Sequence, residues 1–225
     1  LGFNDRSRFH HRRSVDHHRC RRGHRGDLLD NRLGFSHRSD RCRRLGRGSG
    51  VDLIQHAGLN RLRRRLGRDL KRSGFPREKV LAVVVALLAD TLVRVGNETY
   101  ARENKSFGLT TLRNRHLDLL RGGRVRMRFR GKSGQLHEVT VGNRRLGTLV
   151  RGVQQLPGQA LFQYRDDDGV IQPVDSGAVN DYLREVMGED FTAKDFRTWG
   201  GTVAAVQALA ATELPEPASQ RALAQ

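Results

Sequence analysis

The sequence predicts a mainly α-helical domain that carries one small antiparallel β-sheet, an α+β fold. Segments with helical spacing recur from residue 59 onward, and a single pair of alternating segments flanks a Gly-Lys-Ser-Gly turn. The chain has no G-x-G-x-x-G motif and no P-loop. Its 225 residues suffice for one ordinary domain with an appendage.

The first fifty residues differ in composition from the rest of the chain. They contain 14 Arg, 6 His and 5 Asp but no Ala, Ile or Met. A segment with so little apolar surface to bury cannot offset the entropy lost on ordering. We therefore expect residues 1–57 to be a basic low-complexity segment, disordered or read out of frame, and residues 58–225 to be the folded domain. A basic arm that holds DNA non-specifically is the functional alternative for the first part.

The net charge of +18 points to a polyanionic partner, of which nucleic acid is the commonest. Arginine outnumbers lysine 37 to 5, and its planar fork can hold a phosphate through two hydrogen bonds. Codon bias in a GC-rich gene also contributes to this ratio. Cys20 lies near His17, His18 and His24, but without zinc-ligand spacing, so we expect no metal site.

Two helices are expected first. The pattern of Leu59–Arg72 predicts a basic helix, and Pro76 is well placed to begin the next helix. Glu78–Val93 is apolar on nearly all sides, which is typical of a buried core helix, and Gly96 marks its end. The longest apolar run, Val80–Ala89, is too short to span a bilayer, and no secretory signal is visible.

A β-hairpin follows these helices. In the segment 124–130 three apolar residues alternate with four arginines, and in the segment 137–141 three residues expected to face inward alternate with Glu138 and Thr140. Each segment thus has one face to bury and one polar face. The turn between them, Gly131 to Gly134, places Lys132 at the tip of the hairpin.

Three helices are expected in the remainder of the chain. Arg144–Gln155 reads as a helix that Pro157 stops, and Asp175 or Ser176 caps another that runs to Met187. Thr192 and Asp195 form a variant capping box for a helix that starts near Ala193, which Gly200 and Gly201 are placed to kink. Ser219–Gln225 resembles the start of a further helix.

Three stretches of the sequence stand out together. They are Leu92–Asn104 continued by Phe107–His116, then Phe129–Gly134, and last Thr192–Gly200 with its Lys-Asp-Phe-Arg-Thr run. In order and spacing they resemble the catalytic domain of type IB DNA topoisomerases, in the bacterial and poxviral branch, and the resemblance covers residues 58 to 225. A hairpin lysine between two arginines, all in this order, makes the match specific.

The resemblance implies the roles of four residues. Arg94, Lys132 and Arg197 match the family's catalytic residues, with Arg94 expected at the end of the core helix, and Tyr100 matches a tyrosine that contacts the DNA backbone. The family's nucleophilic tyrosine lies several tens of residues beyond the second arginine, and this chain has no tyrosine after Tyr182. We therefore expect a catalytic domain truncated at its carboxyl end.

The chemistry explains why these residue types are required. When a tyrosine oxygen attacks a phosphodiester, negative charge develops on the non-bridging oxygens, which two arginines can hold by charge-assisted hydrogen bonds. The leaving 5′ oxygen needs a proton, and a lysine with a lowered pKa can supply it. The covalent tyrosyl phosphate conserves the energy of the broken bond, so that no ATP is required.

The resemblance thus implies relaxation of supercoiled duplex DNA without metal, ATP or another cofactor, by a monomer located in the bacterial cytoplasm with the nucleoid. One alternative is a catalytically inactive fragment that only binds duplex DNA. A tyrosine recombinase is the remote alternative, because Lys194 stands where recombinases carry a histidine, three positions before the second arginine.

Overall fold

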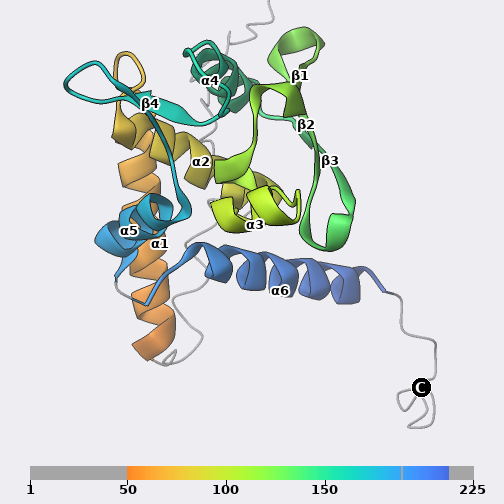
Figure 1. The fold of residues 1–225 in the computed structure, drawn as a ribbon. Coiled ribbons are helices and arrows are strands. Elements are labelled where there is room, and N and C mark those ends of the chain that lie inside the picture. The colour runs from red at the N-terminus through yellow and green to blue at the C-terminus, as the bar shows by residue number, and fades with distance from the viewer. Residues whose placement is uncertain (1–49, 189, 213–225) are drawn as a thin grey trace, which may run out of the picture.

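The computed structural model describes residues 50–188 and 190–212, with side chains from residue 57 onward (Figure 1). Its fold is mainly helical with two small antiparallel sheets, which confirms the predicted class. The expected boundary at residue 57 falls inside the first helix, α1 (Gly50–Asp69). Most of the amino-terminal segment and the helix expected from Ser219 lie outside the described residues.

Helix α2 (Arg77–Thr91) forms the centre of the core. All its residues from Lys79 to Ala89 are buried, which explains why its sequence is apolar on nearly every side. Pro76 occupies the N-cap, immediately before the first helical residue, with a φ of −67° that lies in the range its ring imposes. The helix ends two residues earlier than expected, because Leu92 adopts a left-handed conformation (φ 55°) and its N–H bonds the carbonyl of Leu88.

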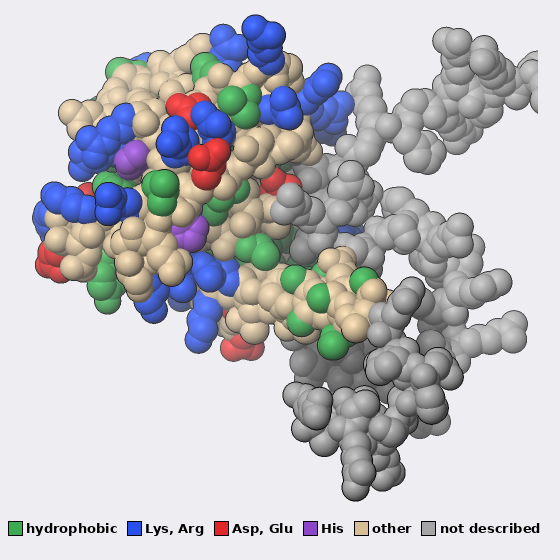
Figure 2. Space-filling model, turned by 90° about the vertical axis from the view of Figure 1, so that its right-hand side faces the viewer, with side chains coloured by type: hydrophobic (Ala, Val, Ile, Leu, Met, Phe, Trp, Pro, Cys, Tyr) green, Lys and Arg blue, Asp and Glu red, His purple; other side chains and the backbone are tan. Residues whose placement is uncertain are grey.

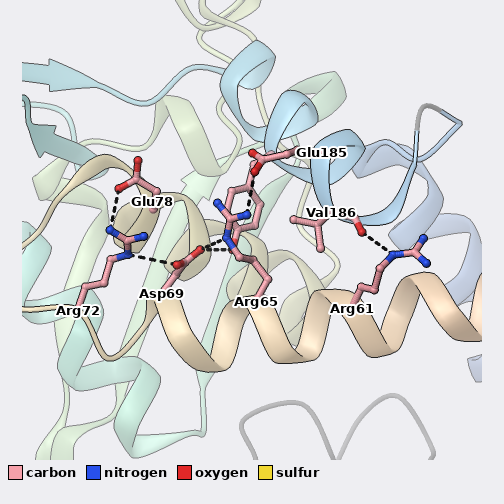
Figure 3. A network of polar contacts seen from close by, with 8 residues as sticks. Arg61, Arg65, Asp69, Arg72, Glu78, Glu185 and Val186 are labelled. Carbon is pink, nitrogen blue, oxygen red and sulfur yellow. Dashed lines mark hydrogen bonds and ion pairs between the residues drawn. The ribbon is translucent and has the colours of Figure 1, made fainter.

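A buried ion-pair network joins α1 to α5 (Ser176–Met187) (Figure 3). Asp69 is only 2% exposed and accepts hydrogen bonds from Arg65 (2.6 Å), Arg72 (3.2 Å) and the Tyr182 hydroxyl (2.9 Å). Arg65 also reaches Glu185 at 2.8 Å. Burial raises the pKa of Asp69, but the hydrogen bonds from Arg65 and Tyr182 outweigh it, so that its pKa lies below the ordinary value.

The predicted hairpin consists of β2 (Val125–Arg130) and β3 (Leu136–Val141), paired antiparallel. Met127 faces Val139 and Phe129 faces His137 in the register. The odd-numbered residues of β2 are buried and the arginines point outward, as the alternation predicts. The sequence did not reveal β1 (Leu117–Leu119), which pairs with β2, or the separate pair β4 (Gln163–Arg165) and β5 (Ile171–Pro173), because three residues are too few to show alternation.

The remaining helices are α3 (Glu98–Glu103), α4 (Arg144–Gln154) and α6 (Ala193–Ala211). The predicted caps are present: Asp175 caps α5, and Thr192 and Asp195 form the capping box of α6. Helix α6 continues through both glycines, and its second half projects from the body of the molecule (Figure 1). No helix in the part of the chain that the structure describes is long and apolar enough to cross a membrane. Short 3-10 turns connect these elements at Leu109–Thr111 (η2), Asn114–His116 (η3), Arg121–Gly123 (η4) and Lys132–Gly134 (η5).

Candidate active site

The four residues singled out from the sequence line one surface groove of about 730 Å³. The groove lies where the turn between β2 and β3 approaches α3 and the first turns of α6 (Figure 1). Four cations line it: Arg94, Lys132, Lys194 and Arg197. Its other lining residues are Val95, Gly96, Asn97, Tyr100, Asn104, Ser106, Phe107, Ser133, Gly134 and Ala193.

Arg94 lies beyond the core helix, not at its end as expected. Since α2 stops at Thr91, Arg94 belongs to the extended segment that leads to α3. The backbone of this segment is anchored, because Leu109 N–H donates to the Arg94 carbonyl (2.9 Å) and Thr110 N–H to the Val95 carbonyl (2.7 Å). The Arg94 side chain is exposed to the groove while its backbone is fixed.

Two glycines make this anchoring possible. A Cβ on Gly108 would lie 2.5 Å from the Gly96 Cα and 2.6 Å from the Arg94 carbonyl oxygen, so no side chain fits there. Gly96 itself has φ +104°, a conformation that other residues rarely adopt. The pair Gly96–Gly108 therefore determines where Arg94 stands.

Lys132 is exposed at the hairpin tip, as predicted. Gly131 N–H donates to the Gln135 carbonyl at 2.8 Å and closes the turn, in which Ser133 has φ 61°. The His137 ring stacks on Phe129 with centroids 5.3 Å apart and touches the α-carbon side of Gly131, where a Cβ would lie 2.4 Å from it. The His137 ring thus packs against the start of the turn that carries Lys132.

Arg197 lies in the second turn of α6, whose start is held by the capping box and by a hydrogen bond from Ala193 N–H to Asn180 (3.0 Å). Gly200 lets the helix approach the end of α2, because a Cβ there would lie 2.4 Å from Leu92. Burial lowers the pKa of the Arg197 guanidinium, and the positive charge of Arg94 lowers it further. The two arginines are therefore close enough to repel each other.

Tyr100 is 61% exposed on α3, where Asn97 caps the helix and accepts from the Tyr100 N–H at 3.3 Å. The other two tyrosines of the chain lie elsewhere. Tyr164 is half-buried on β4, and Tyr182 is buried in the α1–α5 network, where burial raises the pKa of its hydroxyl.

The charge in the groove is of one sign. No Asp or Glu is among its lining residues, and none of the four lining cations forms an ion pair with another described residue. On the face shown in Figure 2, Lys and Arg side chains far outnumber Asp and Glu. Cations left without counter-charges form a site for an anion with several acceptor oxygens, such as a phosphodiester.

The sequence reasoning did not assign Lys194 to this site. It lies three residues before Arg197 in α6, on the same side of the helix, which is a spacing that the sequence shows. The metal question raised by Cys20 and its neighbouring histidines lies outside the described residues. Within 57–188 and 190–212, no group of three or more His, Cys, Asp or Glu side chains could hold a metal ion.

Comparison with known proteins gives one consistent result. The family model described as eukaryotic DNA topoisomerase I, catalytic core, matches residues 54–225. A protein named DNA topoisomerase 1B from Acanthamoeba polyphaga mimivirus is 36% identical over 155 residues, which are 67% of this chain and 46% of the relative. A protein named DNA topoisomerase 1 from Mycosarcoma maydis is 24% identical over 193 residues, 78% of this chain and 18% of the relative. The chain thus spans less than half the length of either relative.

The expected localisation, a bacterial cytoplasm with its nucleoid, is wrong. The two relatives are viral and eukaryotic, and nothing points to a bacterial origin. The motifs could not distinguish a bacterial from a viral protein, because they contain the residues that phosphodiester chemistry requires in both.

Proposed function

The chain belongs to the type IB DNA topoisomerase family, and on that premise we propose that it carries the phosphodiester-binding and proton-donating part of a site that relaxes supercoiled duplex DNA. The observation that carries the proposal is the groove in which Arg94, Lys132 and Arg197 meet without a carboxylate. We propose residues 58–225 as the domain that holds this site.

The two arginines stabilise the transition state. Attack of a tyrosine oxygen on phosphorus breaks the bond from phosphorus to the 5′ oxygen and leaves a 3′-phosphotyrosyl link. Negative charge rises on the non-bridging oxygens during this step, and Arg94 and Arg197 donate charge-assisted hydrogen bonds to them. Burial, and then the positive charge of Arg94, lowers the pKa of Arg197. The repulsion between the two arginines is relieved when the anion lies between them.

Lys132 supplies the proton. Its ammonium group donates a proton to the departing 5′ oxygen, and in religation the neutral amine takes the proton back from the attacking 5′ hydroxyl. Its place at the tip of a hairpin supports this role, because a side chain at a turn reaches further from the body than one on a helix. Tyr100, exposed beside the groove, holds the DNA backbone next to the reacting phosphate.

All these residues come from one chain, and we propose that it acts as a monomer. None of the three tyrosines of the chain is suited to act as the nucleophile. Tyr100 is assigned to the DNA backbone, Tyr164 lies on β4, and the hydroxyl of Tyr182 is buried against Asp69. A segment that carries the family's tyrosine is required for cleavage, and without it the chain binds duplex DNA only.

Relaxation of supercoiled plasmid tests the proposal. A chain extended by a family member's tyrosine-bearing segment should relax plasmid in EDTA without ATP. Arg197→Ala should slow this by about 10²–10³-fold, the usual cost of losing one transition-state donor. Arg68→Ala, which removes an exposed arginine on α1, is the matched control and should keep the rate. If a folded Arg197→Ala protein relaxed plasmid as fast as the control, the proposal would be wrong.

A further inference from the structure

A second group of unpaired arginines lies at the other end of β2 from Lys132. Arg121 belongs to η4 and Arg124 follows it, while Arg144 and Arg145 open α4. All four side chains are exposed, and none is in an ion pair with any residue that the structure describes. We call these four residues the η4–α4 arginine patch.

The backbone is shaped to bring the two pairs together. A Cβ on Gly147 would lie 2.2 Å from the Gly123 carbonyl oxygen, so the η4 turn rests directly on the first turn of α4. Gly122 and Gly123 have φ +74° and +76°, which only glycine adopts without strain. The Arg144 guanidinium lies next to Gly122, 3.9 Å from the position of an added Cβ. Close packing at these glycines therefore holds the backbone of the η4 turn against the start of α4, and with it the two pairs of arginines.

This arrangement is electrostatically unfavourable unless an anion is bound. The four like charges are carried by two elements in contact, and two of them occupy the amino-terminal turn of α4, where the helix dipole disfavours cations. The middle of β2, by contrast, is neutralised on its outer face: Arg126 pairs with Asp118 (3.0 Å) and Glu138 (3.3 Å), and Arg128 pairs with Glu138 (3.4 Å). The sheet thus has uncompensated positive charge at both ends and balanced charge between them.

The distance between the two ends suits a rigid polyanion. Strand β2 has six residues, which corresponds to a length of about 20 Å. One strand of B-DNA carries a phosphate about every 3.4 Å along the helix axis, so this length matches about six base pairs. We propose that duplex DNA lies along β2 and that the η4–α4 arginine patch binds its backbone about six base pairs from the phosphate held in the groove. The inference rests on the proposed function, since it takes duplex DNA as the ligand of the groove.

The salt dependence of DNA binding tests this inference in the 225-residue chain. The slope of log K against log salt is negative, and each phosphate contact that is lost should reduce its magnitude by about 0.9. Arg121→Gln with Arg145→Gln should therefore reduce the magnitude of the slope for a fluorescein-labelled 20-base-pair duplex, followed by anisotropy, by about two. Arg64→Gln with Arg68→Gln removes the same charge from exposed positions on α1 and should leave the slope unchanged. Thermal unfolding of each variant checks its fold. If a double variant does not fold, its two single variants are measured in its place, and each patch single variant should reduce the magnitude of the slope by about 0.9.

The outcomes separate the patch from the groove. A slope that becomes less steep in the patch variant but not in the α1 variant supports the inference. Equal slopes for the patch variant and the wild type, or equal losses in both double variants, would overturn it. Arg94→Ala with Arg197→Ala reports on the groove independently. If only this variant makes the slope less steep, the proposed function is supported and the inference about the patch is wrong.

Discussion

The backbone N–H of Leu109 donates a 2.9 Å hydrogen bond to the carbonyl oxygen of Arg94. The position of one proposed catalytic arginine therefore depends on a segment that lies some fifteen residues later in the chain. The two segments can approach this closely only because position 108 carries no side chain. Precise placement matters, since a displacement of about 1 Å in an active site can cost about 10²-fold in rate.

Gly108→Ala should therefore impair the site. Its Cβ would overlap the Gly96 backbone and the Arg94 carbonyl, so the Arg94 segment must shift. We expect stability to fall by about 1–3 kcal/mol, the usual cost of overpacking, and relaxation by the extended chain to slow by about 10²-fold. Urea unfolding and a plasmid relaxation assay measure the two effects. Gly142→Ala is the control, because nothing lies within 4 Å of its Cβ and its φ is not positive; a similar loss in both variants would refute the positional account.

The buried Asp69 network should make stability depend on pH. The folded-state pKa of Asp69 lies below its ordinary value of 3.8, so the stabilisation is present above about pH 4 and is lost as the pH falls through the folded pKa. Asp69→Asn should cost about 3 kcal/mol at neutral pH, because it removes the negative partner of Arg65 and Arg72. It should also flatten the fall in unfolding free energy that occurs as the pH is lowered below about 4. A variant with the same acid sensitivity as the wild type would show that other carboxyl groups are responsible.

The 225-residue chain should form no covalent adduct with DNA. Tyr100 is exposed at the groove but is proposed to hold the backbone, and the hydroxyl of Tyr182 is engaged with Asp69 in the core. After incubation with labelled duplex, a denaturing gel should show only free DNA, while anisotropy still detects binding. A protein-linked band that disappears in Tyr100→Phe would mean that Tyr100 is the nucleophile and that the assignment from the family resemblance is wrong.

The sequence predicted those parts of the fold that are governed by local rules. The buried face of β2, the caps at Asp175 and Thr192, and the turn around Lys132 all follow from periodicity and side-chain chemistry within a few residues. The strands of three residues and the early end of α2 did not, because they depend on partners elsewhere in the chain. Leu92, for example, has no sequence signal for a left-handed conformation.

The candidate site also has a part that the sequence predicted and a part that it did not. Its residues could be named from the family resemblance, and the structure brings Arg94, Lys132, Tyr100 and Arg197 to one groove. What holds them there could not be predicted. The approach of Gly96 to Gly108 and the support of Gly131 by His137 join segments whose contact no local pattern records.

A duplex with a bridging sulfur in place of the 5′ oxygen tests the central claim most directly, because a thiolate leaves without a proton. In the extended chain, Lys132→Ala should cleave the ordinary duplex slowly and the sulfur-containing duplex at nearly the rate of the unmutated protein. Arg94→Ala and Arg197→Ala should remain about 10²–10³-fold slow on both duplexes, because they lack a donor to the non-bridging oxygens. Equal rescue of all three variants would contradict the account, since Lys132 would then be one more phosphate ligand and not the proton donor.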